Sequence, residues 1–330
     1  MKKKIKKRYF IYGILSLLLI TLIYGQLRGI ILYNEFKIPG KMVEVNGHKM
    51  HIYGEGKNQN TPTVVFTSGW KTPSPYVDYL PLQEKVAKYT RTVTYERPGY
   101  GWSEKANGER DMDTLAMELY QLLKSSGETG PYILVGHSFG ANEVIRFAQL
   151  YPEEVDSVVL LDGSNPNYTV TQKRPSKYFL RYGTITSTIF NNTLNFLNTF
   201  GISRILFDAT DLYETKFTHY KNDLKLVSND MKELDEMMFI KNMNNKNQLH
   251  ELRMDAVKLV KDRNIGSVPL VVMTSSLYND SKFTNDIQSD LLSWSTNSKQ
   301  IIVPNSQHYI QWFNPELIDE QIKELIKEKF

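Results

Sequence analysis

The sequence predicts an α/β protein with a mostly parallel central sheet flanked by helices, a helical cap insertion, and one transmembrane helix at the N-terminus. Short apolar runs of strand length alternate with helical patterns over residues 42–162 and again over 265–330. About a hundred residues without a buried strand, 163–264, separate the two stretches. An uncharged run of 19 residues, 9–27, precedes both. The apolar strand runs are too continuous for one-sided exposure, so they indicate a parallel sheet that is covered on both faces.

Composition narrows the class of protein. Of the 330 residues, 41% are hydrophobic and 23% are charged, which is typical of a globular chain. Lys and Arg number 40 and Asp and Glu number 36, and six of the basic residues lie in the first eight positions. The rest of the chain is close to neutral, so no nucleic-acid partner is expected. The absence of cysteine excludes disulfides and thiolate chemistry but does not decide the compartment.

The N-terminal run is expected to cross a membrane. As a helix, residues 9–27 would be about 28 Å long, close to the hydrocarbon thickness of a bilayer. Tyr9, Tyr12 and Tyr24 lie near its ends, where aromatic rings prefer the interface. The basic residues before the run predict a cytoplasmic N-terminus, with the rest of the chain outside. We therefore expect a single-pass protein of the cell membrane, with the lipid bilayer as a partner through residues 9–27.

A cleaved signal peptide and a buried core helix are the alternatives for this run. A cleaved signal has a shorter apolar core and small residues at its cleavage site. Here the run ends in Tyr24-Gly25-Gln26-Leu27, which offers no such site. An uncleaved signal anchor, with its basic tail, over residues 1–33 is the preferred interpretation.

The elements after the anchor follow from local patterns. Residues 34–41 are expected to form a polar linker. A hairpin follows, in which Asn46-Gly47 is a strong turn signal between strands 42–45 and 48–53. Further expected strands are 63–66, 92–95, 132–135, 158–161, 268–273 and 300–303. Expected helices are 79–88, 112–123 with Asp111 as N-cap, 142–150, 286–294 and 315–329. The core thus comprises 42–162 and 265–330, with 163–264 as a helical cap insertion.

Gly136-His137-Ser138-Phe139-Gly140 is a G-x-S-x-G motif. It follows an apolar strand directly and precedes a helix directly, which is the context that gives this motif its meaning. The glycines let the chain reverse from strand to helix, and the turn lifts the Ser138 hydroxyl clear of the sheet. The backbone N–H of Phe139 then points at developing negative charge. Ser138 is the predicted nucleophile.

A serine nucleophile needs a base and a carboxylate that orients it. Of the six histidines, His308 follows the last strand, so it lies at the carboxyl edge of the sheet with Ser138. Two carboxylates suit the third role. Asp162 closes the strand at 158–161, and Asp280 follows the strand at 268–273. Asp162 is preferred, and Asp280 remains the alternative.

The second oxyanion donor is expected in the loop after the strand at 63–66. There, Gly69 would let the N–H of Trp70 face the site. A turn with a packed tryptophan is the alternative interpretation.

From about residue 42 onward the chain resembles an α/β-hydrolase of the AB-hydrolase-1 type. The segments that carry the resemblance are Ser68-Gly69-Trp70, residues 95–103 with Glu96, Arg97, Gly99 and Gly101, Gly136 to Gly140, and Ser306-Gln307-His308. The resemblance implies that Arg97 and the glycines shape the loop beside the oxyanion hole, and it supports Asp162 as the acid. The departures are Glu96 for the usual Asp, Gln307 for a frequent Gly, and Ala141 for a second Gly after the motif.

The sequence therefore predicts a membrane-anchored serine hydrolase, either carboxylesterase- or lipase-like or peptidase-like, that cleaves a small-molecule ester or amide. The resemblance implies acyl transfer through Ser138, since the dehalogenases and epoxide hydrolases of this fold carry a carboxylate at that position. The alternatives are an acyltransferase with the same triad and a catalytically silent fold that binds a ligand or partner at the cell surface. No cofactor is expected. No metal is expected either, because His250-Glu251 lacks the second histidine of a zinc-protease pattern. The substrate itself is not predicted.

Overall fold

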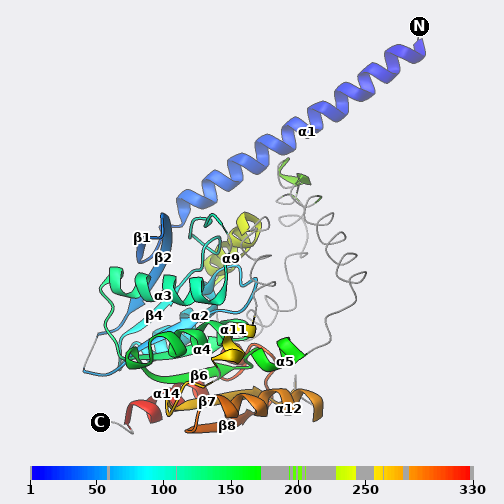
Figure 1. Cartoon of the computed structure of the whole chain (residues 1–330). Helices are drawn as coiled ribbons and strands as arrows, with labels where there is room; N and C mark the ends of the chain where they lie inside the picture. The colour runs from blue at the N-terminus through cyan, green and yellow to red at the C-terminus, as the bar shows by residue number, and fades with distance from the viewer. Residues whose placement is uncertain are drawn as a thin grey trace. The chain divides into compact units, whose positions relative to one another are not determined.

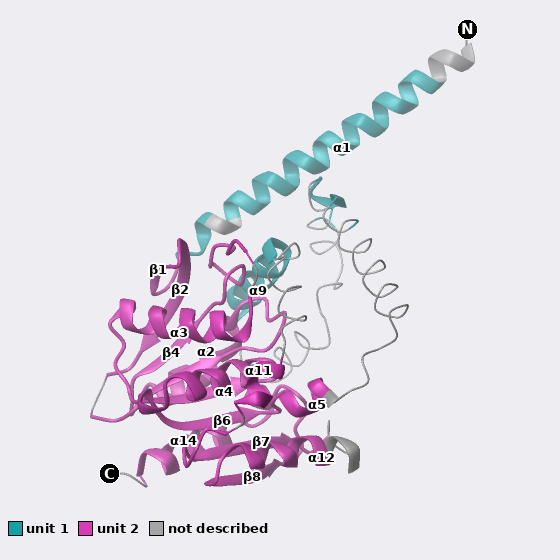
Figure 2. Cartoon of the chain, viewed as in Figure 1, with its two compact units in different colours: residues 1–37, 173–220, 228–244 teal, residues 38–172, 221–227, 245–330 magenta. Residues whose placement is uncertain are grey.

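The computed structural model of the chain describes residues 2–57, 60–108, 110–171, 193, 196–197, 200–202, 205, 228–242, 256–262, 264–277 and 282–327. The chain divides into two compact units (Figure 2). The smaller consists of Met1–Lys37, Lys173–Tyr220 and Ser228–Asn244, and the larger of Ile38–Gln172, Lys221–Val227 and Asn245–Phe330. The larger unit carries the sheet and all the residues that the sequence predicts for the chemistry.

A single sheet organises the larger unit (Figure 1). In the part of the chain that the structure describes, its strands are β1 (Lys41–Val45), β2 (His48–Glu55), β3 (Thr63–Thr67), β4 (Thr92–Tyr95), β5 (Tyr132–His137), β6 (Val155–Leu161), β7 (Leu270–Ser275) and β8 (Ser298–Val303). Their order across the sheet is β1-β2-β4-β3-β5-β6-β7-β8. The pairs β1/β2 and β2/β4 are antiparallel, and all other neighbours are parallel. The predicted, mostly parallel sheet is confirmed.

Helices cover both faces of this sheet. Side chains alternate along β3, so Val65 packs in one core and Val64 and Phe66 pack in the other. The first core includes α3 (Met112–Ser126) and α4 (Gly140–Leu150), and the second includes α2 (Pro75–Val86) and α14 (Pro315–Lys327). The other described helices of this unit are α5 (Pro166–Thr171), α11 (Val257–Lys261), α12 (Lys282–Asp290) and α13 (Ile310–Phe313), with 3₁₀ turns at Pro152–Glu154 and Leu291–Trp294.

Local signals set several boundaries. Asn46 and Gly47 have φ values of +51° and +77°, as a tight hairpin turn requires. Asp111 caps α3, because its carboxylate accepts the N–H of Thr114 at 2.8 Å.

Several elements are shifted from their expected positions, including the helix expected at 286–294, which is α12 (Lys282–Asp290) followed by a 3₁₀ turn at Leu291–Trp294. The second helix begins at Pro75 rather than residue 79, because Ser74 caps it by accepting the N–H of Val77 at 3.3 Å. The strand expected at 268–273 instead runs over Leu270–Ser275. It begins after Pro269, which has no N–H to donate to a ladder.

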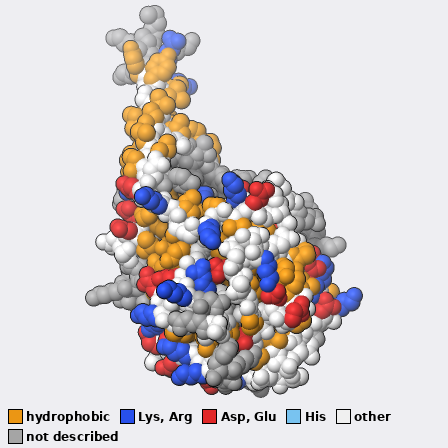
Figure 3. Space-filling view, turned by 90° about the vertical axis from the view of Figure 1, so that its left-hand side faces the viewer, with side chains coloured by type: hydrophobic (Ala, Val, Ile, Leu, Met, Phe, Trp, Pro, Cys, Tyr) orange, Lys and Arg blue, Asp and Glu red, His pale blue; other side chains and the backbone are white. Residues whose placement is uncertain are grey.

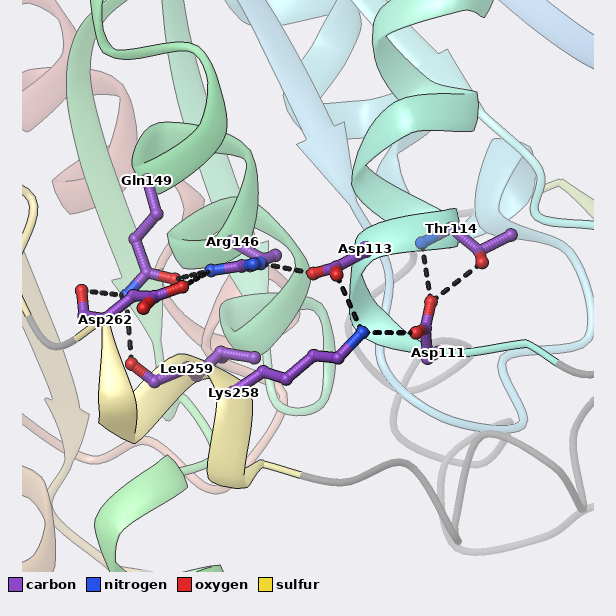
Figure 4. A network of polar contacts seen from close by, with 8 residues as sticks. All are labelled: Asp111, Asp113, Thr114, Arg146, Gln149, Lys258, Leu259 and Asp262. Atoms are coloured by element: carbon purple, nitrogen blue, oxygen red, sulfur yellow. Dashed lines mark hydrogen bonds and ion pairs between the residues drawn. The ribbon is translucent and has the colours of Figure 1, made fainter.

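A polar network fastens α11 to the core (Figure 4). Lys258 donates to one carboxylate oxygen each of Asp111 and Asp113, both at 2.8 Å. Arg146 of α4 donates to Asp113 at 2.6 Å and to Asp262 at 2.9 Å. Burial of Asp111 acts to raise its pKa, but hydrogen bonds from Lys258 and the neighbouring threonine outweigh it and lower the pKa to about 2. These contacts hold the chain where it re-enters the larger unit before β7.

The smaller unit contains α1 (Lys2–Glu35) and α9 (Asn229–Asn242) among its described residues. Within α1, the 25 residues Lys7–Ile31 have a mean hydropathy of 2.0 and are long and apolar enough to cross a membrane, as a signal sequence also is. Figure 3 shows hydrophobic side chains on the surface of this helix. The helix runs to Glu35 and so extends into the stretch expected to be a linker.

Candidate active site

The predicted G-x-S-x-G turn joins β5 to α4. Ser138 lies between the end of the strand and the start of the helix, with φ at +50°. A non-glycine residue in this left-handed region costs about 1–3 kcal/mol, which the surrounding contacts must offset. The N–H of Ser138 donates to the carbonyl of Leu161 at 3.1 Å, and its carbonyl accepts the N–H of Ser164 at 2.9 Å. Ser138 is therefore held against the end of β6.

Close backbone approach explains the two glycines of the motif. A Cβ on Gly136 would lie 2.7 Å from a methyl carbon of Val144 and 2.8 Å from the carbonyl oxygen of Gly140. A Cβ on Gly140 would lie 2.5 Å from the carbonyl oxygen of Thr67 and 2.7 Å from that of Ser68. A larger residue at position 140 would push the turn away from the end of β3 and the loop that follows it, and one at position 136 would push the strand away from α4.

Asp162 directly follows β6 and is buried. Its Oδ1 accepts the backbone N–H of Ser275 at 2.8 Å, and its Oδ2 accepts the Ser275 hydroxyl at 2.5 Å. The Nδ1 of His308 lies 3.3 Å from the same Oδ2. Two donors from the end of β7 thus orient the carboxylate toward the imidazole.

The structure brings His308 to Asp162 across 146 residues of chain. In a neutral imidazole, a ring nitrogen that faces a carboxylate is the one that donates a hydrogen bond, and here that nitrogen is Nδ1. The side chain of His308 is 26% exposed, whereas the carboxylate beside it is 1% exposed. A partly exposed imidazole thus lies next to a buried carboxylate.

His137 is buried and contacts His308. Its Nε2 donates to the backbone carbonyl of His308 at 2.9 Å, and the two imidazole rings are 4.8 Å apart. Burial, and secondarily the nearby imidazole of His308, hold the pKa of His137 well below its ordinary value of about 6.5. His137 is therefore neutral near pH 7 and acts as a fixed hydrogen-bond donor to the loop that carries His308.

The lowered pKa of His137 predicts a loss of stability in acid. The folded state keeps this imidazole neutral while the unfolded state binds a proton below about pH 6.5, so the free energy of unfolding falls as the pH drops. The contribution has a limit of about 1.4 kcal/mol per pH unit and vanishes above about pH 7.5. Urea unfolding of the detergent-solubilised chain between pH 7.5 and 5 should show a steeper decline for wild type than for His137→Gln. If the free energy of unfolding changed with pH equally in both proteins, the prediction would be contradicted.

Arg97 shapes the loop that carries Trp70. Its buried guanidinium donates to the carbonyl of Ser68 at 3.0 Å and to that of Gly69 at 2.7 Å. In a trans peptide the C=O and the following N–H point in opposite directions, so the N–H of Trp70 is directed away from Arg97. Arg97 is itself paired with Glu143 of α4 at 3.0 Å. The loop after β3 and the helix after Ser138 are thereby fixed by the same guanidinium.

Glu96, which replaces the aspartate usual in the resembled family, also has a visible role. Its carboxylate accepts the backbone N–H of Trp102 at 2.6 Å and lies 3.1 Å from Nδ1 of the buried His51. The longer side chain spans the loop that follows β4 and holds its far end.

The alternative acid Asp280 and the residue His250 fall outside the described residues, as does His219. Asp286 is exposed on α12, and Asp290 accepts hydrogen bonds from Asn165 and Asn167. Among the residues that the structure describes, no cluster of His, Asp and Glu is arranged to hold a metal ion.

Comparison with known proteins identifies the family to which the fold belongs. Residues 62–315 match the family described as "alpha/beta hydrolase fold". The chain belongs to the alpha/beta hydrolase family.

Individual relatives match this chain over part of its length or at low sequence identity. The uncharacterized protein YbdG of Bacillus subtilis is 36% identical over 137 residues, and the match covers 42% of this chain and 42% of YbdG. The chain thus spans less than half the length of this curated relative. A putative acyltransferase from Salmonella enterica has a TM-score of 0.64 at 17% identity, covering 88% of this chain and 96% of that one. An enol-lactonase from Burkholderia xenovorans has a TM-score of 0.61 at 14% identity, covering 87% and 100%. Both structures show the shared fold.

Three contacts in this alpha/beta hydrolase were not predicted from the sequence. They are the Ser275 donors to Asp162, the His137 donor to the His308 carbonyl, and the Glu143 partner of Arg97. The sequence carries a weak signal for one of them, because the hydroxyl-rich Thr274-Ser275-Ser276 ends a buried strand at the same sheet edge as Asp162.

Proposed function

We propose that this protein is a serine hydrolase that cleaves an ester or amide bond of a small molecule through an acyl-enzyme on Ser138. The observation that carries the proposal is the position of the strained Ser138 turn, which is hydrogen-bonded to Leu161 at the end of β6. The next residue after β6 is Asp162, and its carboxylate faces His308. These three residues have the types and the order along the chain that this fold uses for acyl transfer.

Each residue then has a defined task. Nε2 of His308 takes the proton of the Ser138 hydroxyl as the oxygen attacks the substrate carbonyl, and later returns that proton to the leaving group. The Asp162 carboxylate holds the proton-bearing Nδ1 and stabilises the imidazolium that forms. Water then attacks the acyl-enzyme, with His308 again acting as the base. This mechanism draws on no cofactor and no metal ion.

We assign the oxyanion hole to the backbone N–H groups of Phe139 and Trp70. Phe139 stands at the N-terminal end of α4, where backbone N–H groups favour negative charge. Arg97 fixes the peptide of Gly69 and Trp70, so this donor is set before substrate binds. A preorganised donor stabilises the tetrahedral oxyanion without reorganising during the reaction.

We also propose that residues 163–264 form a helical cap that selects the substrate. The stretch begins directly after Asp162, and its described elements α5, α9 and α11 are all helices. Segments that connect the elements of a rigid scaffold often carry binding residues, so we assign the contacts that select the substrate to this stretch.

A fluorophosphonate probe tests the chemistry. The full chain in detergent should be labelled once, on the peptide that contains Ser138, and lose its labelling after heat denaturation. A series of p-nitrophenyl esters of increasing chain length, compared with aminoacyl amides, should then identify the preferred acyl group. Product analysis with added alcohols separates hydrolysis from acyl transfer. A folded chain that neither labels nor turns over any of these substrates would favour the catalytically silent alternative.

We further propose that α1 anchors the enzyme in the cell membrane with its N-terminus inside. Six basic residues precede the apolar run, and only Arg28, Lys37 and Lys41 closely follow it. This bias favours a cytoplasmic N-terminus.

Protease added to intact spheroplasts should therefore digest the chain from about residue 35 onward. Protection until the membrane is opened would mean the opposite orientation. Recovery of the domain from the medium, without its first thirty or so residues, would identify a cleaved signal.

A further inference from the structure

One face of α1 is covered within its own unit. The partly buried residues of this helix between positions 7 and 31 are Leu18, Thr21, Leu22, Gly25, Arg28 and Gly29, whereas positions 7–17 are all exposed. A spacing of three and four residues places this set on one side of a helix. The second half of the apolar helix therefore has a protein neighbour along one stripe.

Gly201 contacts the centre of this stripe. A Cβ on Gly25 would overlap the Cα of Gly201, and a Cβ on Gly201 would overlap the carbonyl oxygen of Thr21. Gly201 also has φ at +70°, which a glycine adopts without strain. The two backbones thus meet directly, as they do where small residues pair in membrane proteins.

Two further contacts involve residues of the same unit. Glu233 of α9 pairs with Arg28 at 3.6 Å. The rings of Phe196 and Phe200 contact each other at 4.8 Å, and Phe196 is 61% exposed. An apolar ring therefore stands exposed on the chain that packs against the anchor helix.

The depth of the contact indicates what this ring meets. Gly25 and Thr21 lie three and seven residues before Arg28, the first charge after the apolar run. At 1.5 Å per residue these positions are about 4.5 and 10 Å deeper along the helix than Arg28. If residues 9–27 fill the hydrocarbon layer, a segment that touches Gly25 and Thr21 must enter the outer leaflet.

We propose that the segment carrying Phe196, Phe200 and Gly201 inserts into the outer leaflet beside α1, with the phospholipid acyl region as its partner. The proposal rests on the membrane anchor proposed above. The smaller unit would then hold the bilayer at two places, the spanning helix and this aromatic segment. Aromatic rings are well suited to such a position at the interface.

The chain has no cysteine, so single labels can be placed without background. Phe196→Cys would carry a nitrobenzoxadiazole fluorophore in the full-length protein, reconstituted in phosphatidylcholine vesicles with or without doxyl-labelled acyl chains. Leu17→Cys is the control within the span, where the side chain is 62% exposed. Ile302→Cys is the matched exposed apolar position on β8, at 53%.

We expect doxyl lipid to quench position 196 nearly as strongly as position 17 and to leave position 302 unquenched. Quenching at 17, with position 196 behaving like 302, would overturn this inference and leave the anchor standing. No quenching at 17 would overturn the anchor and the inference together. Fluorophosphonate labelling of Ser138 in the same vesicles reports separately on the proposed chemistry.

Two glycine substitutions in α1 test the contact between Gly25 and Gly201. Gly25→Leu forces the two backbones apart, whereas a side chain at Gly29 would meet nothing within 4 Å. In the Phe196→Cys background, Gly25→Leu should reduce quenching at 196, and Gly29→Leu should leave it unchanged. Equal quenching in both variants would show that the Gly25–Gly201 contact does not hold the segment in the bilayer.

Discussion

Replacement of Ser138 by alanine is expected to lower kcat/KM by about 10⁴-fold or more while the fold stays intact. The side chain is the proposed nucleophile, and no other hydroxyl is held at the turn between β5 and α4. The fold should survive because the hydrogen bonds that anchor Ser138, to Leu161 and from Ser164, are made by its backbone. Ester hydrolysis by the purified chain and its near-ultraviolet circular dichroism would be measured together.

Ser126→Ala is the matched control. Ser126 is also buried, but its hydroxyl bonds to the Leu122 and Leu123 carbonyls at the end of α3. We expect near wild-type turnover for this variant. A folded Ser138→Ala enzyme that keeps its activity would remove Ser138 from the mechanism.

The second large effect is expected at Asp162. Asp162→Asn should lower kcat/KM by about 10⁴-fold, because an amide no longer fixes the imidazole in the tautomer that keeps Nε2 free. The structure adds a second reason. Ser275 directs an N–H and a hydroxyl at the two carboxylate oxygens, so the amide NH₂ of an asparagine would face a donor or turn toward His308.

Asp280→Asn is the companion variant, since Asp280 is the other acid that the sequence leaves open. It should keep near wild-type kcat/KM under the same conditions. The opposite ranking, with Asp280→Asn crippled and Asp162→Asn active, would move the triad acid to the loop after β7.

Much of the fold follows from local patterns in the chain. The alternation of apolar runs and amphipathic segments predicted the parallel sheet, and Asn46-Gly47 and Asp111 marked a hairpin and a helix start that the structure confirms. The predicted start of a helix was less accurate where a capping side chain begins the helix before its apolar pattern begins. The Ser74 cap, for example, starts α2 four residues before the apolar pattern does.

For the candidate site too, some features follow from the local sequence and others depend on the tertiary structure. The turn that carries Ser138 was predictable because the strand, the turn and the helix are contiguous in the sequence. The choice between Asp162 and Asp280 was open, because it depends on which strand end lies opposite the loop of His308.

The sequence by itself determined the class of fold, the apolar N-terminal helix and the turn that carries Ser138, since each depends on residues near one another in the chain. Only the tertiary structure decided that Asp162 and Ser275 meet at His308, that His137 supports the His308 loop, and that Arg97 joins the loop after β3 to Glu143. These contacts join residues from 28 to 171 positions apart. They form because strand order places particular strand ends side by side, and no local periodicity encodes that order.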